Sequence, residues 1–231
     1  MIHPVEVRKA ADGQGDVITG YGAVFFNAAD PGTEYALWSD IIERILPGAF
    51  DRALREDDVR CFFNHDPNLI LGRRNPAAAA AEQTLSLSID SVGLRYSVRP
   101  SDSAIAQHPL SAVGRGDVSG SSFMFEVGKS TWVEEKTAGG DTRWIREITE
   151  IAPLYELGPV CFPAYEATTA AVEGRGTDCQ SVLLPASAEF RAWQQRHIDR
   201  AKESLAAHRT GLTLERLGRH KRHERRLRVR V

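Results

Sequence analysis

Short segments of alternating or mostly apolar residues, typical of β-strands, recur over the first two thirds of the chain. The alternation is clearest in residues 85–90 and 94–98, and the three residues between these segments, which end in Gly93, predict a hairpin. Other segments rich in β-branched, aromatic and aliphatic residues predict further strands at 17–26, 59–63, 119–127, 131–135, 143–152 and 154–162.

Helical periodicity is weaker in this part of the chain. A short helix is expected over 47–55, because Pro47 suits a first helical position and Phe50 and Leu54 lie four residues apart, on one face. A second helix is expected over 101–114, although Pro109 interrupts it. Many short strands and two short helices predict an α+β fold, a mostly antiparallel, barrel-like β domain with helices at its edge.

The pattern changes after residue 170. Residues 1–170 are expected to form the domain, and 171–186, with Gly174 and Gly176, a linker. Residues 187–231 combine an amphipathic helix with a basic tail. The apolar face of this helix consists of Phe190, Trp193, Ile198, Ala201 and Leu205.

Charge divides at the same end of the chain. The 231 residues carry a formal net charge of −2. Residues 209–231 contain nine basic and two acidic residues, or +7, which leaves −9 for residues 1–208. The tail is expected to be a solvated extension, and its cations favour nonspecific, salt-dependent contact with nucleic acid at most, because it has no aromatic residues for specific recognition.

Composition excludes several classes of protein. A hydrophobic content of 42% is enough for a packed core and argues against wholesale disorder. No run of 18 apolar residues predicts a membrane span, and the first residues lack the pattern of a signal peptide. Three cysteines without CxxC spacing argue against a disulfide framework or a cysteine zinc site, and favour a reducing compartment.

Three polar residues stand out on predicted strands. His65 is the one histidine of seven that ends an apolar strand, where it is either a base or simply bound to nearby backbone. Ser122 introduces a strand of large apolar residues, as either a nucleophile or part of a serine-rich turn. Glu156 lies within an apolar strand, so its carboxylate needs a partner, either an arginine or an imidazolium. Together they are a candidate nucleophile, base and orienting acid.

Six further stretches lie in order over roughly residues 17–170. They are 20–25 (GYGAVF), 43–51 (ERILPGAFD), 62–67 (FFNHDP), 93–96 (GLRY), 120–125 (GSSFMF) and 155–164 (YELGPVCFPA). In this order and spacing the chain resembles the bacteriophage prohead (capsid maturation) serine proteases, the tailed-phage relatives of herpesvirus assemblin.

The resemblance implies an assemblin-like β-barrel and a serine endopeptidase that needs no cofactor or metal. The family's general base matches His65 and its nucleophile matches Ser122, with Ser121 as the neighbour. The third member matches Glu156, and the competitor is Glu150, six residues earlier and on the same side if the alternation continues between them. The oxyanion donors are expected in the loop just after Phe162.

The resemblance also implies the partners of the protein. Its substrates would be the major capsid protein and scaffold segments, and family members usually process themselves. Self-association and action inside the assembling procapsid, in the host cytoplasm or from a prophage, follow from that role. The helix and tail would dock to scaffold or shell. The alternative function is a non-enzymatic assembly or scaffold protein with a degenerate protease domain.

Overall fold

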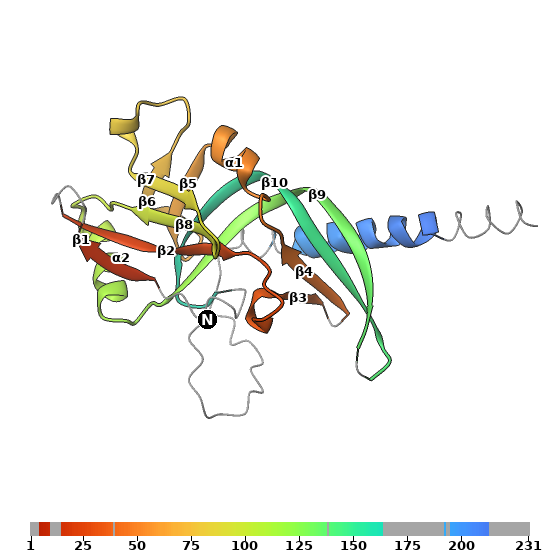
Figure 1. Ribbon diagram of the computed structural model, residues 1–231. Coiled ribbons are helices and arrows are strands. Elements are labelled where there is room, and N and C mark those ends of the chain that lie inside the picture. The colour runs from red at the N-terminus through yellow and green to blue at the C-terminus, as the bar shows by residue number, and fades with distance from the viewer. Residues whose placement is uncertain are drawn as a thin grey trace, which may run out of the picture. The chain divides into compact units, whose positions relative to one another are not determined.

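The computed structural model describes residues 5–9, 15–38, 40–137, 139–163, 192 and 195–212. The chain divides into two compact units, Met1–Phe190 and Arg191–Val231. Two β-sheets make up most of the first unit, with two α-helices and two short 3-10 helices between their strands (Figure 1). The prediction of an α+β fold dominated by strands is therefore confirmed.

The first sheet has four antiparallel strands in the order β1-β2-β8-β7. Residues 85–89 and 93–98 pair directly, which confirms the predicted hairpin. The long strand predicted from residue 17 also forms, and a short strand that the sequence pattern did not predict extends the sheet beside it. The bounds are β1 (Glu6–Lys9), β2 (Asp16–Val24), β7 (Leu85–Ile89) and β8 (Gly93–Val98).

The second sheet has six strands and is organised around one of them, β10. Strand β9 runs antiparallel along the whole of β10, while β4 and β5 lie parallel to its first and second halves on the other edge. The bounds are β3 (Tyr35–Trp38), β4 (Ile41–Ile45), β5 (Val59–Phe63), β6 (Asp66–Arg74), β9 (Gly120–Lys136) and β10 (Thr142–Val160).

Strands β9 and β10 correct the sequence-based prediction. The segments 119–127 and 131–135 form one strand, and 143–152 and 154–162 also form one strand. The register between β9 and β10 shifts repeatedly between Ile148 and Glu156, so the pairing continues through a series of irregularities instead of ending. The sequence suggested a break within each of these strands, but β9 and β10 pair with each other along their length, and this pairing keeps both strands continuous.

The sheets are mostly antiparallel, as predicted, since only the pairings of β10 with β4 and β5 are parallel among the described residues. Single backbone hydrogen bonds join their edges: Val5 N–H to Ser119 C=O at 3.0 Å, and Thr84 N–H to Arg73 C=O at 3.2 Å. No continuous ladder closes the described strands into a cylinder, so the predicted closed barrel is not confirmed.

The helices differ in detail from their predictions. Helix α1 (Asp51–Glu56) begins later than expected, because Gly48, at a φ of 90°, lies in a turn that precedes it. Helix α2 (Ala104–Gly114) forms with Pro109 inside it, and the Ser103 side chain accepts a hydrogen bond from Ala106 N–H at its start. The 3-10 helices are η1 (Pro31–Thr33) and η2 (Ala80–Glu82).

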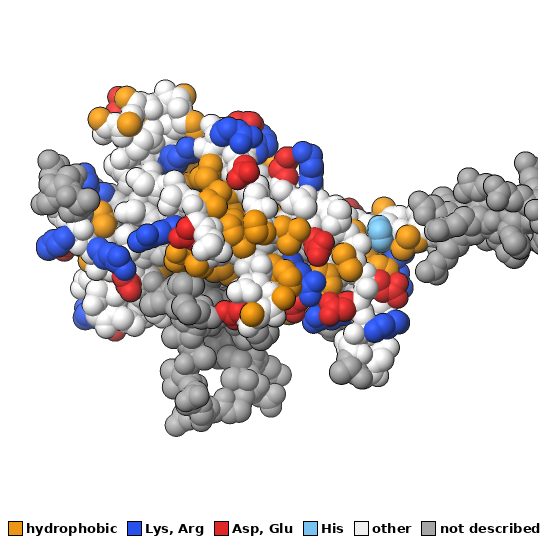
Figure 2. Space-filling view, viewed as in Figure 1, with side chains coloured by type: hydrophobic (Ala, Val, Ile, Leu, Met, Phe, Trp, Pro, Cys, Tyr) orange, Lys and Arg blue, Asp and Glu red, His pale blue; other side chains and the backbone are white. Residues whose placement is uncertain are grey.

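Aromatic side chains form much of the core of the first unit. The rings of Phe123 and Phe125 are stacked at 4.7 Å between centroids, and Phe50 meets Phe123 edge-on at 6.1 Å. All three side chains are fully buried. Hydrophobic side chains also reach the surface near β2 and β8, where charged side chains lie around them (Figure 2).

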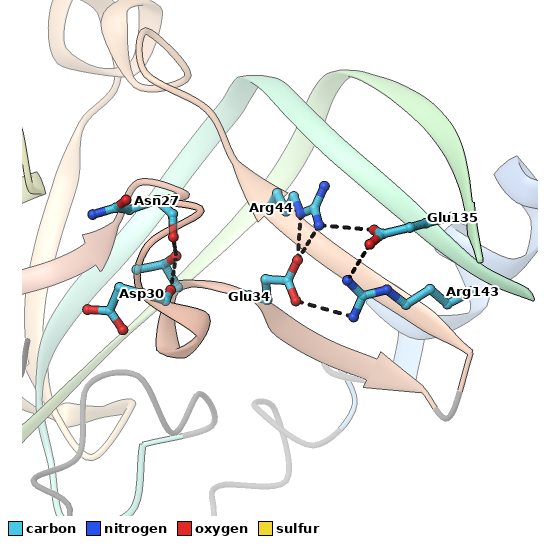
Figure 3. A network of polar contacts seen from close by, with 7 residues as sticks. Asn27, Asp30, Glu34, Arg44, Glu135 and Arg143 are labelled. Carbon is cyan, nitrogen blue, oxygen red and sulfur yellow. Dashed lines mark hydrogen bonds and ion pairs between the residues drawn. The ribbon is translucent and has the colours of Figure 1, made fainter. Parts of the chain in front are cut away.

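A network of charged side chains attaches the β9–β10 hairpin to the segment around β3 and β4 (Figure 3). Arg44 on β4 forms ion pairs with Glu34 and, at 3.2 Å, with Glu135 on β9. Arg143 on β10 pairs with the same two carboxylates, at 3.4 Å and 2.9 Å. The Arg143 guanidinium lowers the pKa of Glu135. Each charge in this network therefore meets two opposite charges, which favours one orientation of the hairpin.

In the second unit, residues 195–212 are helical. Ala201 and Leu205 lie four residues apart on one face of this helix, as the predicted amphipathic pattern requires. Phe190 and Trp193, the linker 171–186 and the tail after residue 212 lie outside the described residues. Within the described part of the chain, no helix combines the length and apolar character needed to cross a membrane.

Candidate active site

His65 lies at the tip of a two-residue hairpin between β5 and β6. Phe63 pairs with Asp66, and the two residues between them, Asn64 and His65, have φ values of 55° and 56°. Positive φ at both central residues is the signature of a type I′ turn, the commonest tight connection between antiparallel strands. Asparagine is well suited to the first position, whereas histidine occupies a position that usually holds glycine.

The imidazole of His65 meets the carboxylate of Glu156 on β10. Nδ1 of His65 is hydrogen-bonded to Oε1 of Glu156, across 91 residues of sequence. Both side chains are removed from solvent, with exposed fractions of 6% and 1%. A buried carboxylate requires a partner, and here the partner is the imidazole.

The competing acid, Glu150, makes a different contact. Its Oε2 lies 2.6 Å from Nζ of Lys129, and its side chain is 27% exposed. The register shifts of β10 separate it from Glu156 and interrupt the simple alternation that would have placed both on one side. The structure therefore brings Glu156 to His65 and directs Glu150 to a surface ion pair.

Ser122 lies on β9, directly opposite Gly158 of β10. It is 1% exposed, and its Oγ has no hydrogen-bond partner among the described residues. The neighbouring Ser121 differs, because its Oγ is 2.9 Å from the hydroxyl of Tyr96 on β8. Successive strand residues face opposite sides, so Ser121 faces the other sheet and Ser122 faces away from it.

Gly158 lies between the strand of Ser122 and the end of β5. A Cβ atom at this position would come within 1.9 Å of the carbonyl oxygen of Phe62. Only glycine allows β5 to approach β10 this closely. The three candidate residues therefore come from three adjacent strands: Ser122 from β9, Glu156 from β10, and His65 from the turn that follows β5.

Glu156 and Cys61 are both buried, with exposed fractions of 1% and 0%. Burial, with a contribution from the Glu156 carboxylate, raises the pKa of the Cys61 thiol. Burial also raises the pKa of the Tyr96 phenol. Charge interactions are stronger in such a dry environment than in water, so the contact between His65 and Glu156 orients the ring firmly.

Asn64 and Gly158 are structural members of the site that the sequence reasoning missed. The Asn64 N–H donates to the carbonyl of Pro159 at 3.0 Å, and its Oδ1 accepts from Cys161 N–H at 2.8 Å. The signal was present, because an asparagine just after an apolar strand is typical of a tight turn.

The oxyanion donors are expected just after Phe162, where the structure describes only Pro163. Pro163 has no N–H, and residues 164–191 lie outside the described ranges. In the described part of the chain, no group of three or more His, Cys, Asp or Glu side chains is arranged to hold a metal ion. An imidazole bonded to a buried carboxylate, with a serine hydroxyl on the strand next to that carboxylate, is a set of groups that suits acyl transfer.

Comparison with protein families gives one match. The family model described as caudovirus prohead serine protease matches residues 3–181, which is more than half of the chain. No curated protein and no solved structure matches it.

Proposed function

The chain belongs to the caudovirus prohead serine protease family, and from this premise we propose that it is an endopeptidase with Ser122 as nucleophile, His65 as general base and Glu156 as orienting acid. One observation carries the assignment of residues. The imidazole of His65 is bonded through Nδ1 to a buried carboxylate, which leaves Nε2 as the nitrogen that can serve a hydroxyl.

The mechanism follows from these roles. Ser122 Oγ attacks the scissile carbonyl carbon, and His65 Nε2 takes the hydroxyl proton. The tetrahedral intermediate collapses, the C–N bond breaks, and the same proton passes to the leaving amine. Water then repeats the sequence on the acyl-enzyme, which releases the carboxylic acid and restores Ser122. Glu156 accepts the Nδ1–H bond throughout, so it selects the tautomer and stabilises the imidazolium.

The unbonded hydroxyl of Ser122 supports this choice of nucleophile. A buried hydroxyl normally has a hydrogen-bond partner, because desolvation without one is costly. Ser121 satisfies that rule through Tyr96, whereas Ser122 has no partner among the residues that the structure describes. Such exceptions are typical of places where a substrate or a reacting group completes the bonding.

The proposed substrates are segments of scaffold and major capsid protein, and segments of this chain itself, cleaved inside the assembling procapsid in the host cytoplasm. The helix at 195–212 and the basic tail would dock the enzyme to scaffold or shell. We also propose that the edges of the two sheets approach a barrel, which the single bonds from Val5 to Ser119 and from Thr84 to Arg73 support.

Covalent labelling of the serine tests the proposal directly. A fluorophosphonate probe should modify Ser122 of the full chain, as located by mass spectrometry of peptides. Labelling should disappear in Ser122→Ala and persist in Ser121→Ala, the matched control one residue away. Absence of labelling at Ser122 in a folded wild-type protein would overturn the assignment and favour a non-enzymatic scaffold protein.

Processing tests the substrate class separately. The chain is co-expressed with its cognate capsid protein, and both are analysed by mass spectrometry. Fragments of either protein should appear with the wild type and vanish with Ser122→Ala. Identical fragment patterns for the two would contradict proteolysis by this site.

A further inference from the structure

We infer that Asn64 is a positioning residue that holds the His65 hairpin against the end of β10. The inference rests on the proposed role of His65 as the base. Asn64 does not touch the reacting atoms, and it acts through the backbone that carries the imidazole.

The hairpin needs such an anchor because the backbone conformation of its two central residues is unfavourable by itself. Asn64 and His65 adopt φ values of 55° and 56°, in the left-handed region that residues with a Cβ atom enter at a cost, although asparagine and histidine enter it more often than most. A strained backbone persists where its surroundings hold it in place, and such strain gathers at functional sites.

Asn64 provides two anchors of good geometry, and both lie on one short segment. Its backbone N–H donates to Pro159 C=O at 3.0 Å, and its side-chain Oδ1 accepts from Cys161 N–H at 2.8 Å. Its Nδ2 is also 3.5 Å from Cys161 Sγ. The anchors therefore fasten the turn both before and after Val160, the last residue of β10.

The same strand carries the acid that orients the imidazole. Pro159 lies three residues after Glu156 on β10, and Asn64 immediately precedes His65. A single rigid segment thus fixes both partners of the Nδ1–Oε1 hydrogen bond. Without the side-chain anchor, only the backbone bond from Asn64 to Pro159 and the His65–Glu156 bond itself hold the turn to β10, so the turn can shift and move the ring relative to its carboxylate.

Displacement of a catalytic group by about 1 Å can cost about 100-fold in rate. The test substitution is Asn64→Gly, because glycine keeps the positive φ and removes only the side-chain anchor. Asn75→Gly is the matched control. Asn75 Oδ1 accepts a backbone N–H, that of Ala77 at 3.0 Å, in the loop after β6.

Two measurements follow the effect. The first is the rate of fluorophosphonate labelling of Ser122 in the full chain. The second is the downfield proton resonance of the His65 imidazole bonded to Glu156, recorded in the Ser122→Ala background. We expect Asn64→Gly to slow labelling by at least about 10-fold and to weaken or shift the resonance. We expect Asn75→Gly to change neither the labelling rate nor the resonance, although it should lower the melting temperature about as much as Asn64→Gly does.

A labelling rate within about twofold of wild type, with an unchanged resonance, would overturn the inference. Asn64→Asp keeps the acceptor oxygen, and we expect it to recover most of the rate lost in Asn64→Gly; equal loss in both variants contradicts the anchoring role. Failure of the proposed function would look different, because the wild type itself would not label. The resonance would still report whether Asn64 positions the ring.

Discussion

Ser121 and Ser122 are adjacent in the chain but lie in opposite environments. Ser121 Oγ is hydrogen-bonded to the Tyr96 hydroxyl at 2.9 Å, whereas Ser122 Oγ has no partner among the described residues. Both are almost completely buried. Successive residues of a strand face opposite sides of the sheet. Ser121 therefore contacts Tyr96, whereas Ser122 lies on the face of the sheet that carries Glu156 and Gly158.

Ser121→Ala is expected to lower stability and leave the nucleophile in place. The substitution removes the partner of a fully buried phenol, which costs about 1–3 kcal/mol in the free energy of unfolding. Urea unfolding should show this loss, while fluorophosphonate labelling of Ser122 continues. If Ser121→Ala unfolds at the same urea concentration as the wild type but no longer reacts with the fluorophosphonate probe, the roles of the two serines are reversed.

Glu156→Gln and Glu150→Gln separate the two candidate acids. Glutamine at 156 cannot stabilise the imidazolium in the same way, so the rate of cleavage should fall by roughly 10³–10⁴-fold. Glutamine at 150 only removes an exposed ion pair with Lys129, so the rate should stay near that of the wild type. The measurement is turnover of a capsid-derived peptide. The reverse ranking would assign the orienting role to Glu150.

Gly158→Ala should separate β5 from β10. The added methyl group would meet the Phe62 carbonyl oxygen at 1.9 Å, and a backbone atom cannot move aside cheaply. We expect loss of cleavage together with a lower melting temperature. Gly139→Ala, in the β9–β10 turn, is the control, because its nearest neighbour would be 3.8 Å away. Retained activity in Gly158→Ala would contradict the close packing of these strands.

Glu43→Gln should destabilise the second sheet far more than Glu6→Gln. Glu43 and Arg146 form an ion pair at 3.2 Å, and their side chains are 1% and 7% exposed. Removing the charge of Glu43 takes away the ion-pair partner of the buried Arg146, which lowers the free energy of unfolding by about 3–5 kcal/mol. The pair of Glu6 with Arg8 is exposed, and its loss should cost about 0–1 kcal/mol. Urea denaturation at neutral pH measures both, and equal losses would refute this ranking.

Alkylation should distinguish Cys61 from Cys161. Cys161 is an exposed free thiol, whereas Cys61 is buried and its pKa is raised by burial and by Glu156. The thiolate is the reactive form, so Cys61 should resist iodoacetamide until the protein unfolds, while Cys161 reacts in the native state. Peptide mass spectrometry without and with urea provides the measurement. Rapid native labelling of Cys61 would show that this part of the sheet opens readily.

Several elements could be predicted from local pattern because they depend on local physics. Alternation identified β7 and β8, and runs of β-branched, aromatic and apolar residues identified β2 and β5. The hairpin between β7 and β8 needed only its flanking strands and a short turn. Strands β1, β3, β4 and β6 escaped prediction, since the first three have only four or five residues and the register of β6 against β5 is irregular.

The sequence by itself determined that this is a mostly β protein of the prohead protease family with His65, Ser122 and Glu156 as candidates, because alternation and ordered motifs are properties of a linear chain. Only the tertiary structure decided which acid meets His65, since register shifts in β10 redirect Glu150 to Lys129. It also distinguished Ser121 from Ser122 and revealed the anchors of Asn64, because hydrogen bonds between distant strands depend on pairing and register, which no local pattern encodes.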